Sequence, residues 1–183
     1  MRNVVLYLSL TFIFIFVFGG KIPPTSYAFP KLKFFPKMTV SAINSVTVEG
    51  ATLGRYLFYD SVLSSDTNMS CASCHKQAFA FSDSPNQFSK GRSGELMKRN
   101  TMALFNLPWY PSFFWDGRAT SIEAQISHPL NARNEMNMPW RDAIERLNKS
   151  KIYKKLFTDA FGNEIIDSVH VSYAIAQFLS TLI

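Results

Sequence analysis

The stretch "NMSCASCHKQAFAFSD", residues 68–83, contains both cysteines of the 183-residue chain, and a histidine directly follows the second one. A disulfide between Cys71 and Cys74 is sterically possible, but redox motifs with this spacing lie beside a βαβ pattern, and this sequence has no convincing strands. A zinc site needs four ligands, and the two cysteines and three histidines of the chain include no second pair at zinc-finger spacing. Both interpretations stay open beside a third one.

The third interpretation is a covalently attached haem. Thiols two residues apart can reach both vinyl groups of one porphyrin, and the adjacent histidine can bind the iron as an axial ligand. We therefore predict haem c, with Cys71 and Cys74 as the thioether anchors and His75 as the proximal ligand. Six phenylalanines are candidates for the wall around the haem, or else for ordinary core packing: Phe79, Phe81, Phe88, Phe105, Phe113 and Phe114.

The N-terminus has the pattern of an export signal. Arg2 precedes the apolar run "VVLYLSLTFIFIFVF", residues 4–18, which is shorter than the roughly 20 apolar residues that span a bilayer. The small residues Ser26 and Ala28 predict cleavage after Ala28, so that residues 1–28 form a signal peptide and the protein is periplasmic. The alternative is an uncleaved signal that anchors the chain in a membrane. Export agrees with haem c, which is attached outside the cytoplasm.

The charge of the chain excludes one class of partner. The net charge is +6, and removal of residues 1–28, with Arg2 and Lys21, leaves +4 without a basic run. A nucleic-acid surface is therefore not indicated. The mild positive charge is compatible with an acidic redox partner, and equally with simple solubility. The length fits one domain, or two at most.

The first half of the chain predicts one helix between irregular segments. Residues 29–46 contain two prolines and no sustained period, which indicates an irregular arm. A helix is expected to follow, with Thr47 as its cap, Leu53 and Leu57 facing inward and Tyr56 alongside.

The second half predicts loops and then helices, and the fold class is all-α with long loops. Residues 61–111 are rich in Ser, Asn, Gly and Lys and indicate loops with short helical turns. An irregular segment of this length in a compact domain is usually functional. Helical patterns follow at 138–150, from Ser150 to Gly162, and from 167 to the last residue. The residues expected on their inward faces are Trp140, Ile144 and Leu147, then Ile152, Leu156 and Phe157, then Ile175, Phe178, Leu179 and Leu182.

The sixth ligand position of the iron separates an electron carrier from a catalyst. An electron-transfer haem is closed by a methionine or a second histidine, whereas a catalytic haem keeps that position open or weakly held. Four methionines are candidates for the sixth ligand of a His/Met electron carrier, although each of them can instead fill the core. They are Met97, Met102, Met136 and Met138.

Further motifs carry a resemblance to a known family. They are "LGRYLFYDSVLSSD" (53–66), "CASCHKQAFAFSD" (71–83), "RN" before a small residue (99–101), "FFWDGRA" (113–119), and a glutamine, "HP" and "NEM" between 125 and 136. Over residues 47–183 the chain resembles the N-terminal, peroxidatic haem domain of the bacterial dihaem cytochrome c peroxidase and MauG family. The resemblance implies a cytochrome c-like domain whose long loops wrap around one covalent haem c.

The resemblance also implies roles for individual residues. Glu135 matches the distal carboxylate that moves the peroxide proton from one oxygen to the other, and Gln125 matches the amide that orients peroxide. Pro129 is expected to shape the roof of the pocket. Trp115 matches the tryptophan that relays electrons between two haems, and Asn100 matches a residue that helps to hold calcium between two domains.

The sequence departs from the family in two ways. The loop between the haem motif and "RN" contains no histidine, so an iron that is open to peroxide from the outset is expected. The chain has no further cysteine, so the second haem domain is expected to be absent. A donor cytochrome or a second-haem protein would then have to supply the electrons.

These observations together predict haem-dependent reduction of hydrogen peroxide to water. The alternatives are a monohaem c-type electron-transfer protein, an incomplete remnant of a dihaem peroxidase, and MauG-like oxidation of residues on a partner protein. The predicted domains are the signal peptide at 1–28, the arm at 29–46 and the haem domain at 47–183.

Overall fold

The computed structural model describes residues 23–39 and 41–183. In these residues α-helices and short 3₁₀ turns are joined by long loops, and extended pairing is limited to isolated bridges. The described part of the chain therefore confirms the predicted all-α fold. The helices are α1 (Val48–Tyr59), α2 (Cys71–Cys74), α3 (Ile122–Asn131), α4 (Trp140–Asn148), α5 (Lys151–Phe161) and α6 (Ser168–Ser180), and the 3₁₀ turns are η1 (Ser61–Leu63), η2 (Gln77–Phe79) and η3 (Leu107–Trp109).

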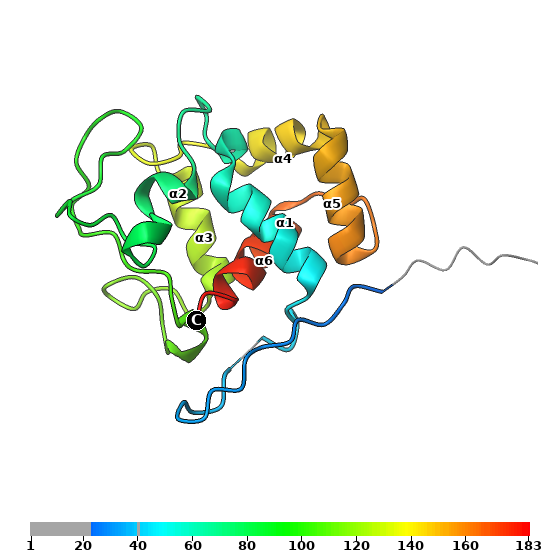
Figure 1. Cartoon of the computed structure of the whole chain (residues 1–183). Coiled ribbons are helices and arrows are strands. Elements are labelled where there is room, and N and C mark those ends of the chain that lie inside the picture. The colour runs from blue at the N-terminus through cyan, green and yellow to red at the C-terminus, as the bar shows by residue number, and fades with distance from the viewer. Residues whose placement is uncertain (1–22, 40) are drawn as a thin grey trace, which may run out of the picture.

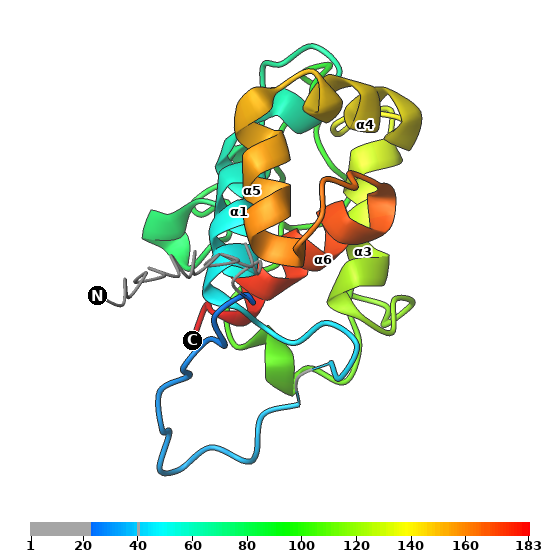
Figure 2. The same ribbon diagram turned by 90° about the vertical axis from the view of Figure 1, so that its right-hand side faces the viewer.

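The packing of α1 against α6 forms the centre of the fold. Figures 1 and 2 show α5 and α6 against α1, with α3 on another side of α6. Gly54 permits the close approach of α1 to α6, because a Cβ atom there would lie 1.9 Å from the carbonyl oxygen of Ala174. The buried Gln177 of α6 accepts hydrogen bonds from the amide and the hydroxyl of Thr47, just before α1. The two helices are therefore fixed both by packing and by polar contacts.

Local capping signals predicted several helix ends correctly. Thr47 accepts a hydrogen bond from the Gly50 amide at the start of α1. Ser150 caps α5, which ends at Gly162 in the left-handed conformation with φ of 73°. The last helix, α6, ends at Ser180 and does not continue to the last residue as expected.

Two predictions about inward faces are wrong. Tyr56 of α1 is 55% exposed and Ile152 of α5 is 67% exposed. The buried stripe of α5 instead runs through Tyr153, Phe157 and Ala160, because α5 is rotated relative to the pattern read from its sequence. The rotation depends on where α1 lies, which no local pattern contains.

The sequence pattern did not predict α3. A proline inside a helix removes one hydrogen bond and clashes with the carbonyl four residues earlier, so Pro129 is not a residue that indicates a helix. The structure places Pro129 in the last turn of α3, where the helix ends two residues later. At the other end, Ser121 accepts a hydrogen bond from the Ala124 amide at 3.1 Å. A proline near the end of a helix is tolerated because little of the helix follows it.

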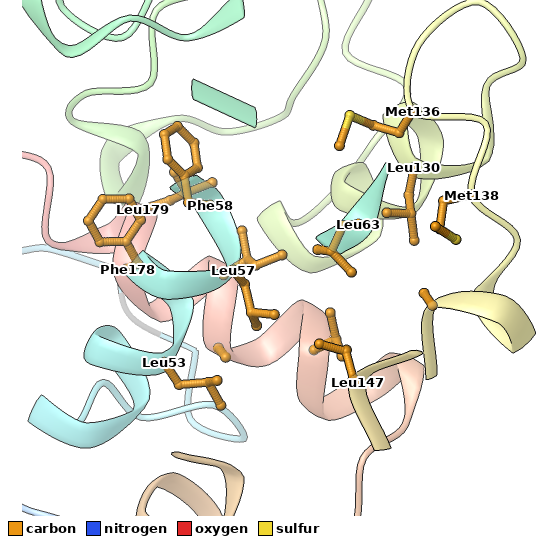
Figure 3. Close-up of a cluster of buried hydrophobic side chains, with 14 of the residues drawn as sticks. Leu53, Leu57, Phe58, Leu63, Leu130, Met136, Met138, Leu147, Phe178 and Leu179 are labelled. Carbon is orange, nitrogen blue, oxygen red and sulfur yellow. The ribbon is translucent and has the colours of Figure 1, made fainter. Parts of the chain in front are cut away.

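A continuous hydrophobic core connects α1, α6 and the C-terminal helices (Figure 3). Phe58 of α1 packs against Phe178 of α6, with ring centroids 5.3 Å apart. Leu53, Leu57 and Leu147 are fully buried. The core thus covers the inner faces of the helices and extends toward the loops around α2. It also contains Leu63, Leu130, Met136, Met138 and Leu179.

The arm that precedes α1 is irregular, as predicted, and it is docked on the fold. The indole Nε1 of Trp109 donates to the Pro36 carbonyl at 2.9 Å, and the ring of Phe35 lies 5.1 Å from the Trp109 ring. Residues 1–22, with the predicted export run, lie outside the described residues. Within residues 23–39 and 41–183 no helix is long and apolar enough to cross a membrane.

Candidate functional site

A cavity of about 480 Å³ collects the residues that the sequence singled out. Its volume lies in the range of roughly 300–1,000 Å³ that is usual for ligand and cofactor pockets. The cavity lies among α2, α3 and the loops that follow them. Every predicted site residue lines it: Cys71, Cys74, His75, Asn100, Trp115, Gln125, Pro129 and Glu135.

The single turn of α2 presents both cysteines to the cavity. The turn is stabilised by a hydrogen bond from the Ser70 amide to the Ser73 hydroxyl at 3.0 Å. Both thiols are free, and burial raises the pKa of Cys71 to about 12. The described residues contain no cluster of three or more His, Cys, Asp or Glu. The geometry therefore supports neither the disulfide nor the zinc hypothesis.

His75 follows α2 directly, and its hydrogen-bond partners include the backbones of Phe81 and Met102. Its Nδ1 lies 2.9 Å from the carbonyl oxygen of Phe81, and because a carbonyl only accepts, Nδ1 carries the proton. Burial lowers the pKa of His75, which favours the neutral ring. The lone pair of Nε2 is then available to a metal ion.

The conformation of the loop after His75 directs the Phe81 carbonyl toward the imidazole ring. Ala80 and Phe81 have φ values of 53° and 56°, in the left-handed region that residues other than glycine rarely adopt. Lys76, at the start of the loop, forms an ion pair with the buried carboxylate of Asp83 at its end. Burial opposes ionisation of Asp83, but hydrogen bonds from Lys76 and two polar neighbours hold its pKa below the usual value. The loop is thus closed by an ionised carboxylate.

One face of α3 forms another wall of the cavity. Gln125 lies in the middle of this face, and its neighbours along the helix axis are apolar. The spacing of three and four residues is that of a single helix face. The lining residues of α3 are Ile122, Gln125, Ile126, Pro129 and Leu130.

The chain turns back after α3 and brings Glu135 to the same cavity. In this turn the Met136 amide donates to the Pro129 carbonyl at 3.1 Å. Burial raises the pKa of Glu135, and the positive charge of Arg118 acts in the opposite direction. A carboxyl group with a raised pKa is suited to accepting and returning a proton.

Arg118 lines the cavity and was missed by the sequence analysis. Its guanidinium group lies over the ring of Phe114, 3.5 Å from the ring centroid. Its Nη1 donates to both carboxylate oxygens of Asp116 at 2.9 Å, and Arg99 donates to the same carboxylate at 3.0 Å. The motif "FFWDGRA" includes Arg118, so its place three residues after Trp115 was the available signal.

Trp115 lies where the cavity meets the protein surface and is 60% exposed. Its indole Nε1 donates to the backbone carbonyl of Asn100 at 2.8 Å. The side-chain amide of Asn100 donates to the Gln87 carbonyl at 2.9 Å. The structure therefore makes Trp115 and Asn100 neighbours, at the edge of the cavity and away from the core.

Most of the six phenylalanines that were candidates either for a haem wall or for ordinary core packing do not line the cavity. Of the six, Phe114 lines the cavity. Phe79 and Phe105 are 42% and 39% exposed. Phe81 packs instead on Phe58, with ring centroids 5.9 Å apart, and Phe58 supplies a cavity wall that the sequence did not indicate.

The candidate methionine ligands are reduced to three. Met97, Met102 and Met136 line the cavity, whereas Met138 is 1% exposed in the core and does not. The sulfur of Met97 accepts a hydrogen bond from the Asn134 side chain at 3.5 Å. A methionine ligand therefore remains compatible with the cavity.

The residues present fit a covalently held haem. One turn carries two free thiols, the adjacent imidazole has an available nitrogen, and much of the remaining wall is apolar. A tetrapyrrole needs such a wall because most of its surface is apolar. The apolar lining that belongs at the same time to the hydrophobic core consists of Phe58, Leu63, Leu104, Leu130, Met136, Ile175 and Leu179.

Comparison with known proteins agrees with this fit. The sequence model of the family described as di-haem cytochrome c peroxidase matches residues 48–183. The methylamine utilization protein MauG of Methylophilus methylotrophus is 33% identical over 189 aligned positions, which cover 100% of this chain and 53% of that protein. MauG of Methylorubrum extorquens is 40% identical over 141 positions, covering 76% of this chain and 40% of that protein. The cytochrome c551 peroxidase of Nitrosomonas europaea is 28% identical over 148 positions, covering 81% and 44%.

Solved structures show the same fold. A MauG-like protein associated with microbial copper homeostasis superposes with a TM-score of 0.77 at 27% identity, covering 85% of this chain and 47% of that one. The diheme peroxidase BthA of Burkholderia thailandensis gives a TM-score of 0.65 at 24% identity, covering 78% and 41%. The chain thus spans about half the length of the relatives that it matches. With the family match over most of its length, the chain belongs to the di-haem cytochrome c peroxidase family.

Proposed function

We propose that the chain reduces hydrogen peroxide to water at a haem c held in the cavity, with electrons from a cytochrome or a second-haem partner. The observation that carries the proposal is that His75, Gln125 and Glu135 line one cavity and that the carboxyl group among them has a raised pKa. The relatives named cytochrome c peroxidase support the same reaction class.

In this proposal Cys71 and Cys74 hold the haem through thioether bonds, and Nε2 of His75 binds its iron. The Phe81 carbonyl keeps the imidazole in one tautomer and makes Nε2 a stronger donor. Bound there, the haem supplies electrons and a Lewis-acid centre for breaking the O–O bond. Pro129 limits the space beside Gln125 on the same face of α3.

Glu135 is proposed to move the proton. As a carboxylate it accepts the proton of one peroxide oxygen, and it then returns this proton to the other oxygen, which leaves as water. Gln125 can donate through its amide nitrogen and accept through its oxygen, so it can orient peroxide before the transfer. The position of Glu135 in a turn that is hydrogen-bonded to the end of α3 keeps the two side chains in one cavity.

Trp115 is proposed to pass electrons into the site, because it both lines the cavity and reaches the surface. The donor would be a cytochrome or a second-haem partner that contacts this surface. Calcium beside Asn100 belongs to the same proposal, and its further ligands would come from outside the described residues.

We also propose the domain organisation that the sequence pattern and the resemblance together predict. Residues 47–183 form a haem domain preceded by an arm at 29–46, and an N-terminal leader directs export to the periplasm. The second haem of the family would lie on a further part of a longer chain or on a separate protein. The chain spans about half the length of the relatives that it matches, which supports placing the second haem outside residues 47–183.

The substitution Glu135→Gln tests the proposal. It keeps the size of the side chain and removes its ability to accept a proton, so the reaction of the purified haem protein with peroxide should slow by about 10²–10⁴-fold. Stopped-flow absorbance measures the rate, and an unchanged resting spectrum verifies that the haem site is intact. Glu164→Gln, at an exposed position, is the matched control and should react normally. An unchanged rate in Glu135→Gln would refute the assigned role.

A second candidate function is the oxidation of residues on a partner protein. It is favoured by the 60% exposure of Trp115, which lets a protein contact the electron path directly. The relatives named MauG favour it as well. The two functions differ in the effect of Trp115→Phe: oxidation of a protein partner should be lost, whereas the first reaction with peroxide should persist.

The third candidate is an electron carrier with a methionine ligand. Met97, Met102 and Met136 line the cavity, so each of them is a candidate for the methionine ligand of such a carrier. A low-spin ferric spectrum with the weak far-red band of methionine coordination, and no reaction with peroxide, would favour the carrier over the peroxidase.

A further inference from the structure

Residues 25–28, which precede the predicted cleavage point, are hydrogen-bonded to the start of α1. The amide and the hydroxyl of Thr25 donate to the two carboxylate oxygens of Glu49, at 2.7 and 2.9 Å. The carbonyl of Thr25 accepts a hydrogen bond from the amide of Val48 at 2.8 Å. One residue therefore contacts the first turn of α1 through three separate groups.

The next residues continue this contact. Ser26 and Thr47 form an antiparallel bridge, and the Tyr27 amide donates to the Val46 carbonyl at 3.0 Å. The ring of Tyr27 also packs against that of Phe29 at 4.9 Å. Residues 25–28 thus run antiparallel to the residues that lead into α1.

These contacts satisfy groups that the start of a helix leaves open. The first amides of a helix have no acceptor within the helix, and Val48 is the first residue of α1. Burial opposes ionisation of Glu49, but its own backbone and both Thr25 groups hold its pKa below the usual value. Without residues 25–28, the Val48 amide would lose this acceptor and Glu49 would lose two donors.

The helix concerned is central to the fold. α1 carries Leu53, Leu57 and Phe58, which are at most 1% exposed, and it packs against α5 and α6. Phe58 also lines the cavity. Loss of partners at the start of α1 would therefore affect the element on which both the core and the cavity depend.

We propose that residues 25–28 stay on the mature protein as the first segment of the folded domain, so that any removal of a leader takes place before Thr25. Such removal is hydrolysis of one peptide bond, in which water supplies the hydroxyl of the new carboxyl group and a hydrogen of the new amino group. The bond after Ala28 fits the small-residue preference of signal peptidase, but its cleavage would separate Thr25 and Tyr27 from α1. The proposal is independent of haem and peroxide chemistry.

The direct test is intact-mass measurement and N-terminal sequencing of the protein after export from a bacterium that attaches c-type haem. The expected mature chain begins at Thr25 or earlier, and a chain that retains its leader also satisfies the proposal. A mature chain that begins at Phe29 would overturn it.

A second measurement asks whether the contacts stabilise the mature protein. Thr25→Ala and Glu49→Gln are made singly and together in the full chain, and each single variant should lower Tm by about 2–4 °C. The double variant should lower Tm by less than the sum, because both changes remove the same contact. Glu95→Gln, at an exposed position, should leave Tm unchanged. A mature Thr25→Ala protein with the Tm of the parent would contradict the proposal.

Discussion

At the level of single residues, Glu135 and Arg118 are coupled through their charges. The carboxyl group of Glu135 makes no ion pair or hydrogen bond with another described residue, and its pKa is raised by burial. Arg118 is held away from it by Phe114 on one side and Asp116 on the other. The positive charge of Arg118 therefore lowers the pKa of Glu135, although the two side chains form no direct ion pair.

Removal of this charge should move the pH dependence of the peroxide reaction. If Glu135 acts as a carboxylate, the rate falls as the pH drops through the pKa of Glu135. Arg118 favours the carboxylate and so lowers this pKa, which means that Arg118→Gln should raise it. The acid limb of the pH–rate profile should therefore shift to higher pH.

The control for this prediction is Arg133→Gln, because Arg133 is exposed and does not line the cavity. Its pH–rate profile should match that of the parent protein. An acid limb that stays in place in Arg118→Gln, or moves to lower pH, would show that Arg118 does not lower the pKa of the carboxyl group on which the rate depends.

At the level of elements, the loop from Lys76 to Asp83 positions the ring of His75. Asp83 is 4% exposed and is bonded to Lys76 and Asn86. Asp83→Asn should therefore destabilise the protein by about 1–3 kcal/mol, since it leaves these donors with a weaker acceptor. Thermal unfolding measures the change. Asp159→Asn removes a surface pair with Lys155 and should cost less than about 1 kcal/mol.

A second prediction concerns the crossing of α1 and α6. In Gly54→Ala the added methyl group would meet the Ala174 carbonyl, 1.9 Å from the position of the new Cβ. The helices must then move apart, which should cost about 1–3 kcal/mol. Arg55→Ala, at the neighbouring exposed position, should change the free energy of unfolding by less than about 0.5 kcal/mol. Equal stability of the two variants in urea unfolding would argue against the close contact.

At the level of the whole molecule, the hydrophobic core and the cavity share one wall. Phe58, Leu63 and Leu130 are buried in the core and also line the cavity. A haem in the cavity would therefore complete the core as well as provide a reactive centre. Folding and cofactor attachment should accordingly be linked.

The double variant Cys71→Ala, Cys74→Ala tests this link. It should be exported without covalent haem, as shown by its intact mass, and should unfold at a Tm lower by roughly 6–12 °C. This range corresponds to a loss of about 3 kcal/mol of apolar contact at the cavity. Cys74→Ala alone keeps one thiol and should lie between the double variant and the parent. A double variant with the parental Tm would show that the core is complete without the haem.

Local signals predicted much of the fold and the residues that the structure brings to one cavity. Thr47, Ser150 and Gly162 mark helix ends because capping depends on residues a few positions apart. No helix was predicted at α3, which contains Pro129, because a single residue does not reveal how close it lies to the end of a helix. The exposure of Tyr56 and of Ile152 was also missed, since the face that a helix buries depends on the neighbouring helices.

The sequence by itself determined which residues to expect together at one cavity, because the "CASCH" spacing and the family motifs lie within short segments. Only the tertiary structure decided what surrounds them. It placed the Phe81 carbonyl on Nδ1 of His75, Arg118 within electrostatic range of Glu135, and Thr25 against the start of α1. The physical reason is distance along the chain: these partners are brought together by loops whose paths are set by packing and burial, and burial is also what shifts the pKa of a carboxyl group or an imidazole.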